Sequence, residues 1–186
     1  MQSNDEVVGI LLAAGRSRRF GRDKLLHPLA DGTLMAIASA YALRAVLPRT
    51  IAVVRADNET LAAVFAAHGI ETTVAENAAS GMGASLAAGI AATAQACGWI
   101  VALGDMPFIH PQTIASVANQ LRAGACLAAA AYKGQRGHPV GFSGIYRDQL
   151  LALRGDQGAR SLLQQYDSEL VLVECEDPGV LVDIDT

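Results

Sequence analysis

Short apolar runs alternate along the chain with segments whose apolar residues recur at helical spacing. The apolar runs predict strands at Val7–Leu12, Thr50–Val54, Glu71–Ala75, Trp99–Leu103, Leu127–Tyr132, Val140–Phe142 and Leu170–Glu174. The segments between them predict helices at Leu34–Val46, Glu59–His68, Ala84–Ala96, Gln112–Arg122, Arg147–Leu153 and Ala159–Tyr166. This alternation predicts an α/β fold with a mostly parallel central sheet and helices on both faces. In such sheets ligands bind beyond the carboxyl ends of the strands, so the loops at 13–24, 76–83, 104–108 and 133–139 are the places to search.

Composition narrows the class of protein. The 186 residues are 52% hydrophobic and contain no linker or repeat, which predicts a single domain over residues 1–186 with a substantial core. A net charge of -4 argues against a nucleic-acid binder. The absence of a signal peptide or a long apolar run argues against a membrane protein. Three widely spaced cysteines without a CxxC pair predict buried, reduced thiols in a cytoplasmic protein.

The loop after the first predicted strand is rich in small and basic residues. Between Ala13 and Lys24 it carries five basic side chains against one acidic one. Glycine lets backbone N–H groups approach phosphate oxygens, and the cations supply a positive field. The pattern therefore favours a polyphosphate site, although its glycine spacing fits neither the P-loop nor the dinucleotide fingerprint. The alternative is an ordinary exposed loop with solvated arginines.

A carboxylate follows the fourth predicted strand. Asp105 stands in the sequence Gly-Asp-Met-Pro directly after Trp99–Leu103, where it would project into the ligand crevice. One carboxylate with room for water and substrate phosphates is the usual arrangement for Mg²⁺. Asp183 and Asp185 form a second acidic pair near the end of the chain, which favours a metal site over a turn or helix-cap aspartate.

Three further motifs are open to two interpretations each. The Ser80–Leu86 segment, SGMGASL, is typical either of a nucleotide-binding turn or of a helix start capped by Ser80 or Ser85. His138 precedes a proline on a predicted loop, and is either structural or a substrate contact. Arg160 follows Gly155-Asp156-Gln157-Gly158-Ala159 at a predicted helix start, where it is either solvated or free to bind an anion.

The motifs LAAGRSRRFGRDKLL, SGMGASL, GDMPF, RGHPVGF, GDQGAR and VDIDT, taken in this order, resemble those of the molybdenum cofactor cytidylyltransferase, or MocA-like, family. The resemblance runs from Ile10 to Thr186. The first and third motifs occur in many nucleotidyltransferases, whereas GHPV and GDxGAR are more characteristic of this branch. The resemblance implies a Rossmann-like nucleotidyltransferase fold and a CTP-dependent reaction on the terminal phosphate of the molybdopterin cofactor.

The same resemblance assigns roles to individual positions. Residues similar to the family's triphosphate loop are Ala13, Ala14, Gly15, Arg19 and Lys24, and those similar to its base and ribose site are Asn77, Ser80, Gly81 and Ser85. The cofactor substrate is expected to face His138, Pro139, Asp156 and Arg160. Asp105 matches the metal aspartate, and Asp183 and Asp185 match the closing acidic motif. Lys24, Arg19 and Asp105 are the expected catalytic residues.

The resemblance thus predicts transfer of CMP from CTP to the molybdenum cofactor, with release of pyrophosphate and with Mg²⁺, or Mn²⁺ as an alternative. The family also implies transient partnership with a molybdenum hydroxylase or its chaperone. An alanine at position 14 is similar to the cytidylyl form, because the related guanylyltransferases have a second glycine there. The alternatives are a GTP-dependent enzyme, a nucleotidyltransferase acting on a sugar or other phosphate, and a non-catalytic cofactor carrier. The carrier is considered because relatives usually continue with a helix beyond the position of Thr186.

Overall fold

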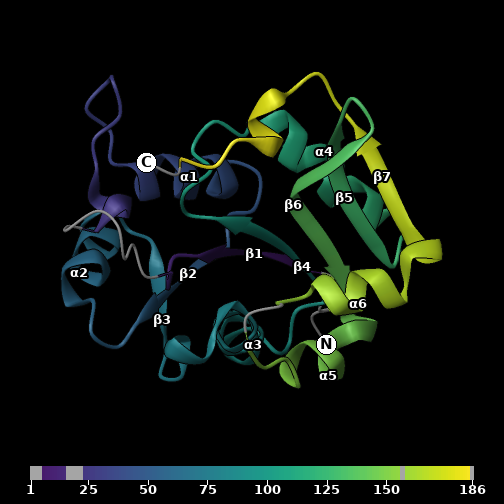
Figure 1. The fold of residues 1–186 in the computed structure, drawn as a ribbon, viewed down its shortest axis with the longest axis horizontal. Coiled ribbons are helices and arrows are strands. Elements are labelled where there is room, and N and C mark those ends of the chain that lie inside the picture. The colour runs from purple at the N-terminus through teal and green to yellow at the C-terminus, as the bar shows by residue number, and fades with distance from the viewer. Residues whose placement is uncertain (1–5, 16–22, 156–157, 185–186) are drawn as a thin grey trace.

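The computed structural model describes residues 6–15, 23–155 and 158–184, and its centre is a seven-stranded sheet (Figure 1). The strands occur in the order β3-β2-β1-β4-β6-β5-β7. Their bounds are β1 Val7–Leu12, β2 Thr50–Arg55, β3 Glu71–Ala75, β4 Gly98–Leu103, β5 Leu127–Tyr132, β6 Gln135–Ser143 and β7 Leu170–Glu174. All neighbouring pairs are parallel except the two that include β6, which runs antiparallel to β4 and to β5.

Helices cover both faces of this sheet. The α-helices are α1 Met35–Arg44, α2 Glu59–Ala67, α3 Met82–Ala92, α4 Pro111–Arg122, α5 Arg147–Leu151 and α6 Arg160–Gln165. Buried residues of α1, α2 and α4 share one hydrophobic core, and those of α3, α5 and α6 share a second core. In Figure 1, α1 and α4 accordingly lie above the sheet, and α3, α5 and α6 lie below it. The predicted α/β class and the mostly parallel sheet are confirmed.

Short 3₁₀ helices complete the described structure. They are η1 Lys24–Leu26, η2 Ala78–Ser80, η3 Gly144–Tyr146, η4 Asp167–Glu169 and η5 Pro178–Leu181. No helix within the described ranges is long and apolar enough to cross a membrane. Cys97, Cys126 and Cys175 form no disulfide and are partly exposed, so the prediction of buried thiols overstated their burial.

The expected loop at 133–139 and the expected strand start at Val140 are wrong. Lys133 and Gly134 form the turn, and β6 begins at Gln135. Proline has no N–H for the sheet, and the polar start of this strand lacks an apolar alternation, so the pattern argued against a strand here. The β5–β6 register shifts between Ala129 and Ala131, which accommodates the proline in a bulge.

The order in which strands are added to the sheet reverses at the boundary between β1 and β4. From β1 the chain adds β2 and then β3 on one side, while β4 lies on the other side, and all four strands are parallel. The loops after β1 and β4 therefore flank a topological switch point, where ligands bind in sheets of this kind. Since β6 is antiparallel to β4, its first residues lie at the same edge.

Candidate functional site

A lysine and an aspartate from the two loops at the switch point form an ion pair. Lys24 begins η1 at the end of the loop that follows β1, and Asp105 follows β4. The Nζ atom of Lys24 lies 2.8 Å from Oδ2 of Asp105. Both side chains are partly exposed, at 16% and 23%, so a ligand can reach them from solvent. The two residues predicted from separate motifs are thus brought into direct contact.

The segment before the C-terminus closes this corner. Nζ of Lys24 also donates a hydrogen bond of 3.3 Å to the carbonyl oxygen of Ile184. The N–H of Ile184 donates to the carbonyl oxygen of Asp105 at 2.9 Å. Asp183 is exposed beside this contact, while Asp185 lies outside the described residues. In Figure 1 the yellow C-terminal segment accordingly crosses the upper edge of the molecule toward α1.

The backbone of the Asp105 turn is held from two more sides. The N–H of Gly104 donates to the carbonyl oxygen of Leu12 at 2.9 Å. The hydroxyl of Ser39 on α1 donates to the carbonyl oxygen of Gly104 at 3.0 Å and is 4% exposed. Buried hydrogen bonds of this kind restrict a turn because an unsatisfied carbonyl is costly. Sequence reasoning missed Ser39, since a serine within an apolar helix carries no local signal of a contact 65 residues away.

His138 belongs to the same edge of the sheet, although it lies on β6 and not on the predicted loop. It stands two residues before Val140, which pairs with Val101, and is therefore level with the last residue of β4. Burial lowers its pKa below the ordinary 6.5; the negative charge of Asp105 opposes this shift, and Arg136 adds slightly to it. The imidazole is thus neutral at pH 7 and offers the site a hydrogen-bonding group without a charge. Pro139 follows it as a buried residue.

The structure describes both ends of the phosphate loop, residues 13–15 and 23–24. Ala13 and Ala14 are buried, and Gly15 is exposed. Nη1 of Arg55, the last residue of β2, donates to the carbonyl oxygen of Gly15 at 2.7 Å. Residues 16–22, with the predicted catalytic Arg19, lie outside the described residues.

The other end of this loop is attached to the start of α2. The side chain of Asn58 donates to Oδ2 of Asp23, whose Oδ1 accepts from the N–H of Leu25 at 3.1 Å. These bonds hold the residue directly before Lys24. The β2–α2 turn therefore contacts both described ends of the loop, through Arg55 and Asn58, which the sequence analysis did not single out.

The predicted base and ribose segment forms the start of α3. Gly81 is the N-cap residue at φ 115°, a conformation that favours glycine, and no side chain caps the helix. This outcome removes the interpretation of Ser80 or Ser85 as the helix cap. Asn77 and Ser80 are exposed on the preceding turn, whereas Ser85 is buried.

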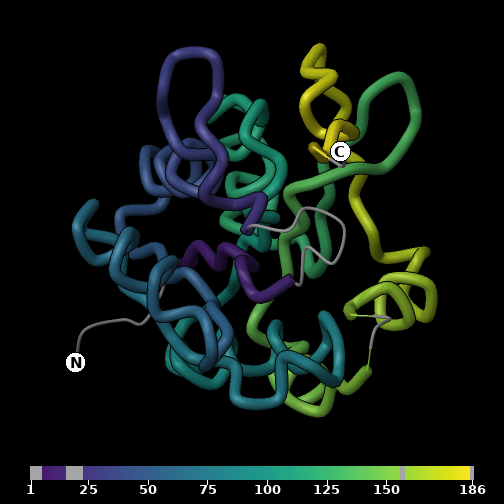
Figure 2. The backbone as a smooth tube through the Cα atoms, turned by 60° about the vertical axis from the view of Figure 1, so that its left-hand side comes forward, coloured from purple at the N-terminus to yellow at the C-terminus, as the bar shows by residue number. Residues whose placement is uncertain are grey.

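Two motifs that are about 70 residues apart in sequence meet at this helix start. The N–H of Gly83 donates to the carbonyl oxygen of Gly155 at 2.9 Å, so the GDxGAR segment lies against the start of α3. Arg160 is exposed at the first residue of α6, and Asp156 lies outside the described residues. Figure 2 shows the same proximity from another side, with the yellow-green chain beside the teal one.

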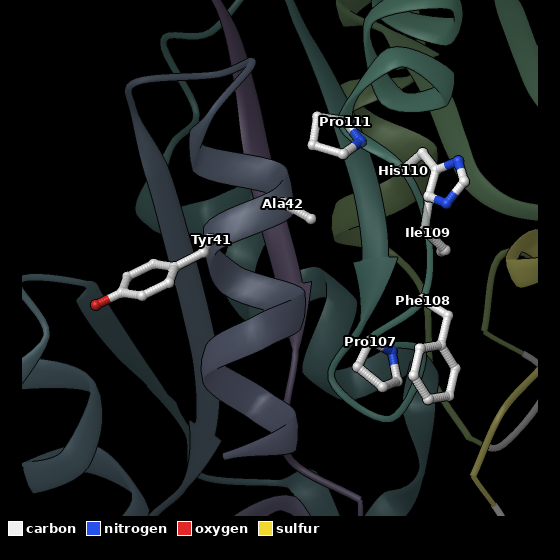
Figure 3. Close-up of a pocket in the computed structure, with 7 residues that line it drawn as sticks. All are labelled: Tyr41, Ala42, Pro107, Phe108, Ile109, His110 and Pro111. Carbon is white, nitrogen blue, oxygen red and sulfur yellow. The ribbon is translucent and has the colours of Figure 1, made fainter. Parts of the chain in front are cut away.

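A separate groove lies on the α1 side of the Asp105 turn (Figure 3). It has a volume of about 490 Å³, and α1 forms one wall while the segment from Pro107 to Pro111 forms the other. Tyr41, Ala42, Phe108, Ile109 and His110 complete its lining. Lys24, Asp105 and His138 do not line it, so the polar corner and this largely apolar groove are different surfaces.

The polar corner contains carboxylates, which are ligands that a hard divalent cation prefers. Mg²⁺ is typically held by one or two carboxylates together with substrate phosphates and water. Asp105 supplies one carboxylate at the strand end, and Asp183 supplies another beside the contact of Ile184 with Asp105. Among the described residues no group of three or more His, Cys, Asp or Glu side chains could hold a metal, so a bound nucleotide would have to complete the coordination.

Comparison with known proteins gives three groups of matches. The family model for the MobA-like NTP transferase domain matches residues 9–170. The purine catabolism protein PucB of Bacillus subtilis (strain 168) is 30% identical over 97% of this chain and 92% of its own length. The nicotine blue oxidoreductase of Paenarthrobacter nicotinovorans is 31% identical with the same coverage.

Solved structures show the same architecture. Rv0371c from Mycobacterium tuberculosis H37Rv superposes with a TM-score of 0.86 at 28% identity, covering 99% of this chain and 94% of the other. A structure of Rv0371c in complex with manganese superposes with a TM-score of 0.81 at 27% identity, over 97% of this chain and 94% of the other. These matches confirm the Rossmann-like nucleotidyltransferase fold and the family resemblance inferred from the motifs.

Proposed function

We propose that this chain, which belongs to the MobA-like NTP transferase family, transfers CMP from CTP to the terminal phosphate of the molybdenum cofactor and releases pyrophosphate. The observation that carries the proposal is the corner at the switch point. There Lys24 from the phosphate loop contacts Asp105 at 2.8 Å, and the segment ending at Ile184 closes over both. A cation and a carboxylate at a strand edge suit the handling of a triphosphate and its metal ion.

The reaction needs positioning and neutralisation of charge more than a dedicated base. An oxygen of the acceptor phosphate attacks the α-phosphorus of CTP in line. The bond between this phosphorus and the oxygen bridging to the β-phosphate breaks, and pyrophosphate leaves with the electron pair. The acceptor phosphate is already anionic, so no protein group has to remove a proton from it. The ammonium group of Lys24 balances the charge that develops on the leaving group, as do Arg19 and the backbone N–H groups of residues 14–21.

The metal in this proposal is Mg²⁺, with Mn²⁺ as an alternative. Asp105 would hold it together with Asp183 or Asp185, and the ion would supply Lewis-acid stabilisation of the phosphate oxygens. The structure of Rv0371c with manganese supports the use of a divalent cation by a similar protein. His138, Pro139, Asp156 and Arg160 are assigned to the cofactor substrate, and Asn77, Ser80, Gly81 and Ser85 to the base and ribose.

The choice of CTP rests on a single position. Ala14 is 5% exposed and packs in the core below the phosphate loop, where the guanylyltransferase pattern has glycine. The preference for CTP therefore rests on the resemblance of the Ala13-Ala14-Gly15 run to the cytidylyl form. The product is expected to pass to a molybdenum hydroxylase or its chaperone.

The proposal is tested by pyrophosphate release from CTP and, separately, from GTP, with Mg²⁺ and purified molybdenum cofactor. We expect release with CTP and little with GTP. Release with GTP alone would overturn the interpretation of Ala14 and keep the transfer chemistry. Release with a sugar 1-phosphate or methylerythritol phosphate, and none with the molybdenum cofactor, would assign a different acceptor. Cofactor binding with no release from either nucleotide would favour a carrier.

A further inference from the structure

We propose that Asp177 is a positioning residue that anchors the segment from Pro178 to Ile184 across the Asp105 turn. This inference rests on the proposed function, because the segment brings Asp183, a proposed metal ligand, to the polar corner of Lys24 and Asp105. Asp177 itself lies too deep to touch a substrate, since it is 3% exposed. Its effect on transfer therefore has to act through the residues that it holds.

The carboxylate of Asp177 joins two parts of the chain. Its Oδ2 accepts hydrogen bonds from the N–H of His110 and from the hydroxyl of Thr113, both at 2.8 Å. Its Oδ1 accepts from the N–H of Gly179 at 3.0 Å. One carboxylate thus ties the start of η5 to the start of α4. The segment that leads to α4 begins at the Asp105 turn, so Asp177 contacts the chain five residues after Asp105, at His110.

The position suits a buried negative charge. His110 is the N-cap residue of α4, and its own side chain makes no capping hydrogen bond. Asp177, which is 67 residues away, accepts from the backbone N–H of His110 and from the side-chain hydroxyl of Thr113 in the first turn, and so satisfies one of the free N–H groups at this helix end. The positive end of the α4 dipole and the hydrogen bonds favour a carboxylate at this position, and Nδ1 of His110 lies 4.0 Å from its Oδ2.

Two close backbone approaches guide the chain from this anchor to the corner. A Cβ atom added to Gly179 would lie 2.3 Å from the carbonyl oxygen of Phe108, so η5 presses directly on the segment after Asp105. A Cβ atom added to Gly137 would lie 2.1 Å from the carbonyl oxygen of Val180, so η5 also presses on β6. The segment then reaches Ile184, whose N–H bonds to the carbonyl oxygen of Asp105.

This arrangement gives Asp177 a role that helix capping alone would not. Between the anchor and Asp183 lie five residues, and they are seated between the Asp105 segment and the start of β6. Loosening the anchor would therefore move Asp183 and the carbonyl of Ile184 relative to Asp105 and Lys24. Groups that orient metal ligands without touching the metal typically change affinity or activity by about 10- to 100-fold when they are removed.

The test compares three variants in the full chain. Asp177→Asn keeps the size of the side chain, but its amide group would meet the N–H of either His110 or Gly179 as a second donor. Thr113→Val removes one hydrogen bond and keeps the volume. Ser116→Ala is the matched control on α4, because its hydroxyl donates only to the local carbonyl of Gln112 and its residue is not part of the site.

For Asp177→Asn we expect the Mn²⁺ concentration for half-maximal activity to rise about 10- to 100-fold. The KM for CTP should stay within about 2-fold, since among the described residues the carboxylate of Asp177 bonds to His110, Thr113 and Gly179 and not to the phosphate or base segments. Amide hydrogen exchange should rise in peptides covering 178–184 and stay unchanged in α3. Thr113→Val should shift the same quantities in the same direction by less, and Ser116→Ala should match the unchanged protein.

Each result decides the proposal. A normal Mn²⁺ requirement in Asp177→Asn together with faster exchange at 178–184 would make the anchor purely structural and overturn the positioning role. Unchanged exchange would overturn the anchor itself. If Asp177→Asn fails to fold, Thr113→Val carries the test with the same criteria. Absence of pyrophosphate release from the unchanged protein would refute the proposed function, and exchange in the variants would still decide whether Asp177 anchors the segment.

Discussion

Replacing Gly137 with alanine tests whether close packing of η5 against β6 matters for transfer. The added Cβ atom would lie 2.1 Å from the carbonyl oxygen of Val180 and 2.8 Å from its carbonyl carbon. Since Cβ contacts shorter than 3.0 Å essentially do not occur, β6 and η5 would have to separate by about 0.9 Å or more. Both contacting atoms are backbone atoms, so no side-chain rotation can relieve the overlap.

A displacement of about 1 Å at a reacting centre can cost about 100-fold in rate. We therefore expect Gly137→Ala to lower kcat by about that factor, measured as pyrophosphate release at saturating CTP and Mg²⁺. Overpacking should also lower stability by about 1–3 kcal/mol. At about 2–4 °C per kcal/mol for a chain of this size, the fall in Tm would be measurable by thermal unfolding.

Gly141→Ala is the control on the same strand. Its Cβ atom would meet Ile100 Cδ1 at 3.1 Å and Leu121 Cδ1 at 3.2 Å, which are the far ends of flexible side chains. This variant should lose some stability and keep kcat within about 2-fold. If Gly137→Ala retains the kcat of the unchanged protein, or if Gly141→Ala loses activity to the same extent, the packing of η5 on β6 does not control transfer.

Further predictions concern single side chains of the corner. Ser39→Ala should cost about 1–3 kcal/mol in urea unfolding, because the buried carbonyl of Gly104 loses its donor; an unchanged midpoint would contradict this. Asp105→Ala should fold, as judged by circular dichroism, yet lose nearly all pyrophosphate release, and near-normal turnover would remove the metal assignment. Lys24→Ala should raise the KM for CTP and lower kcat by about 10²–10³-fold, and an unchanged kcat/KM would exclude Lys24 from the site. The pKa of His138 in the folded chain lies below 6.5. As the pH drops below about 6.5, the unfolded chain therefore binds more protons than the folded chain, and the free energy of unfolding falls. His138→Gln should flatten this fall in urea unfolding between pH 7.5 and 5 without added metal, and an unaltered slope would argue against a lowered pKa of His138 in the folded chain.

Much of the sheet could be predicted because parallel strands buried on both faces are nearly continuous apolar runs. Val7–Leu12 and Leu127–Tyr132 have the predicted bounds in the structure. The beginning of β6 was missed because polar residues and Pro139 interrupt the pattern, and its pairing with β4 and β5 depends on long-range contacts. Strand pairing that tertiary structure imposes leaves little trace in local alternation.

Part of the candidate site could likewise be predicted from the sequence, and part could not. Lys24 and Asp105 could be selected as candidates because each lies in a loop that follows a buried strand, where ligands are expected to bind. Their mutual contact, and the closure by Ile184, could not be inferred, since these residues are far apart in the sequence. Asp177 had a weak local signal in its Asp-Pro-Gly turn, but its partners on α4 are about 65 residues away.

Identification of the reaction product tests the proposed transfer of CMP to the molybdenum cofactor. Molybdenum cofactor would be incubated with the protein, Mg²⁺ and an equimolar mixture of CTP and GTP, and the cofactor then analysed by mass spectrometry. We expect a cofactor that is heavier by one CMP, formed together with one pyrophosphate, and no such product with Asp105→Ala. A cofactor of unchanged mass, or one carrying GMP in place of CMP, would contradict it.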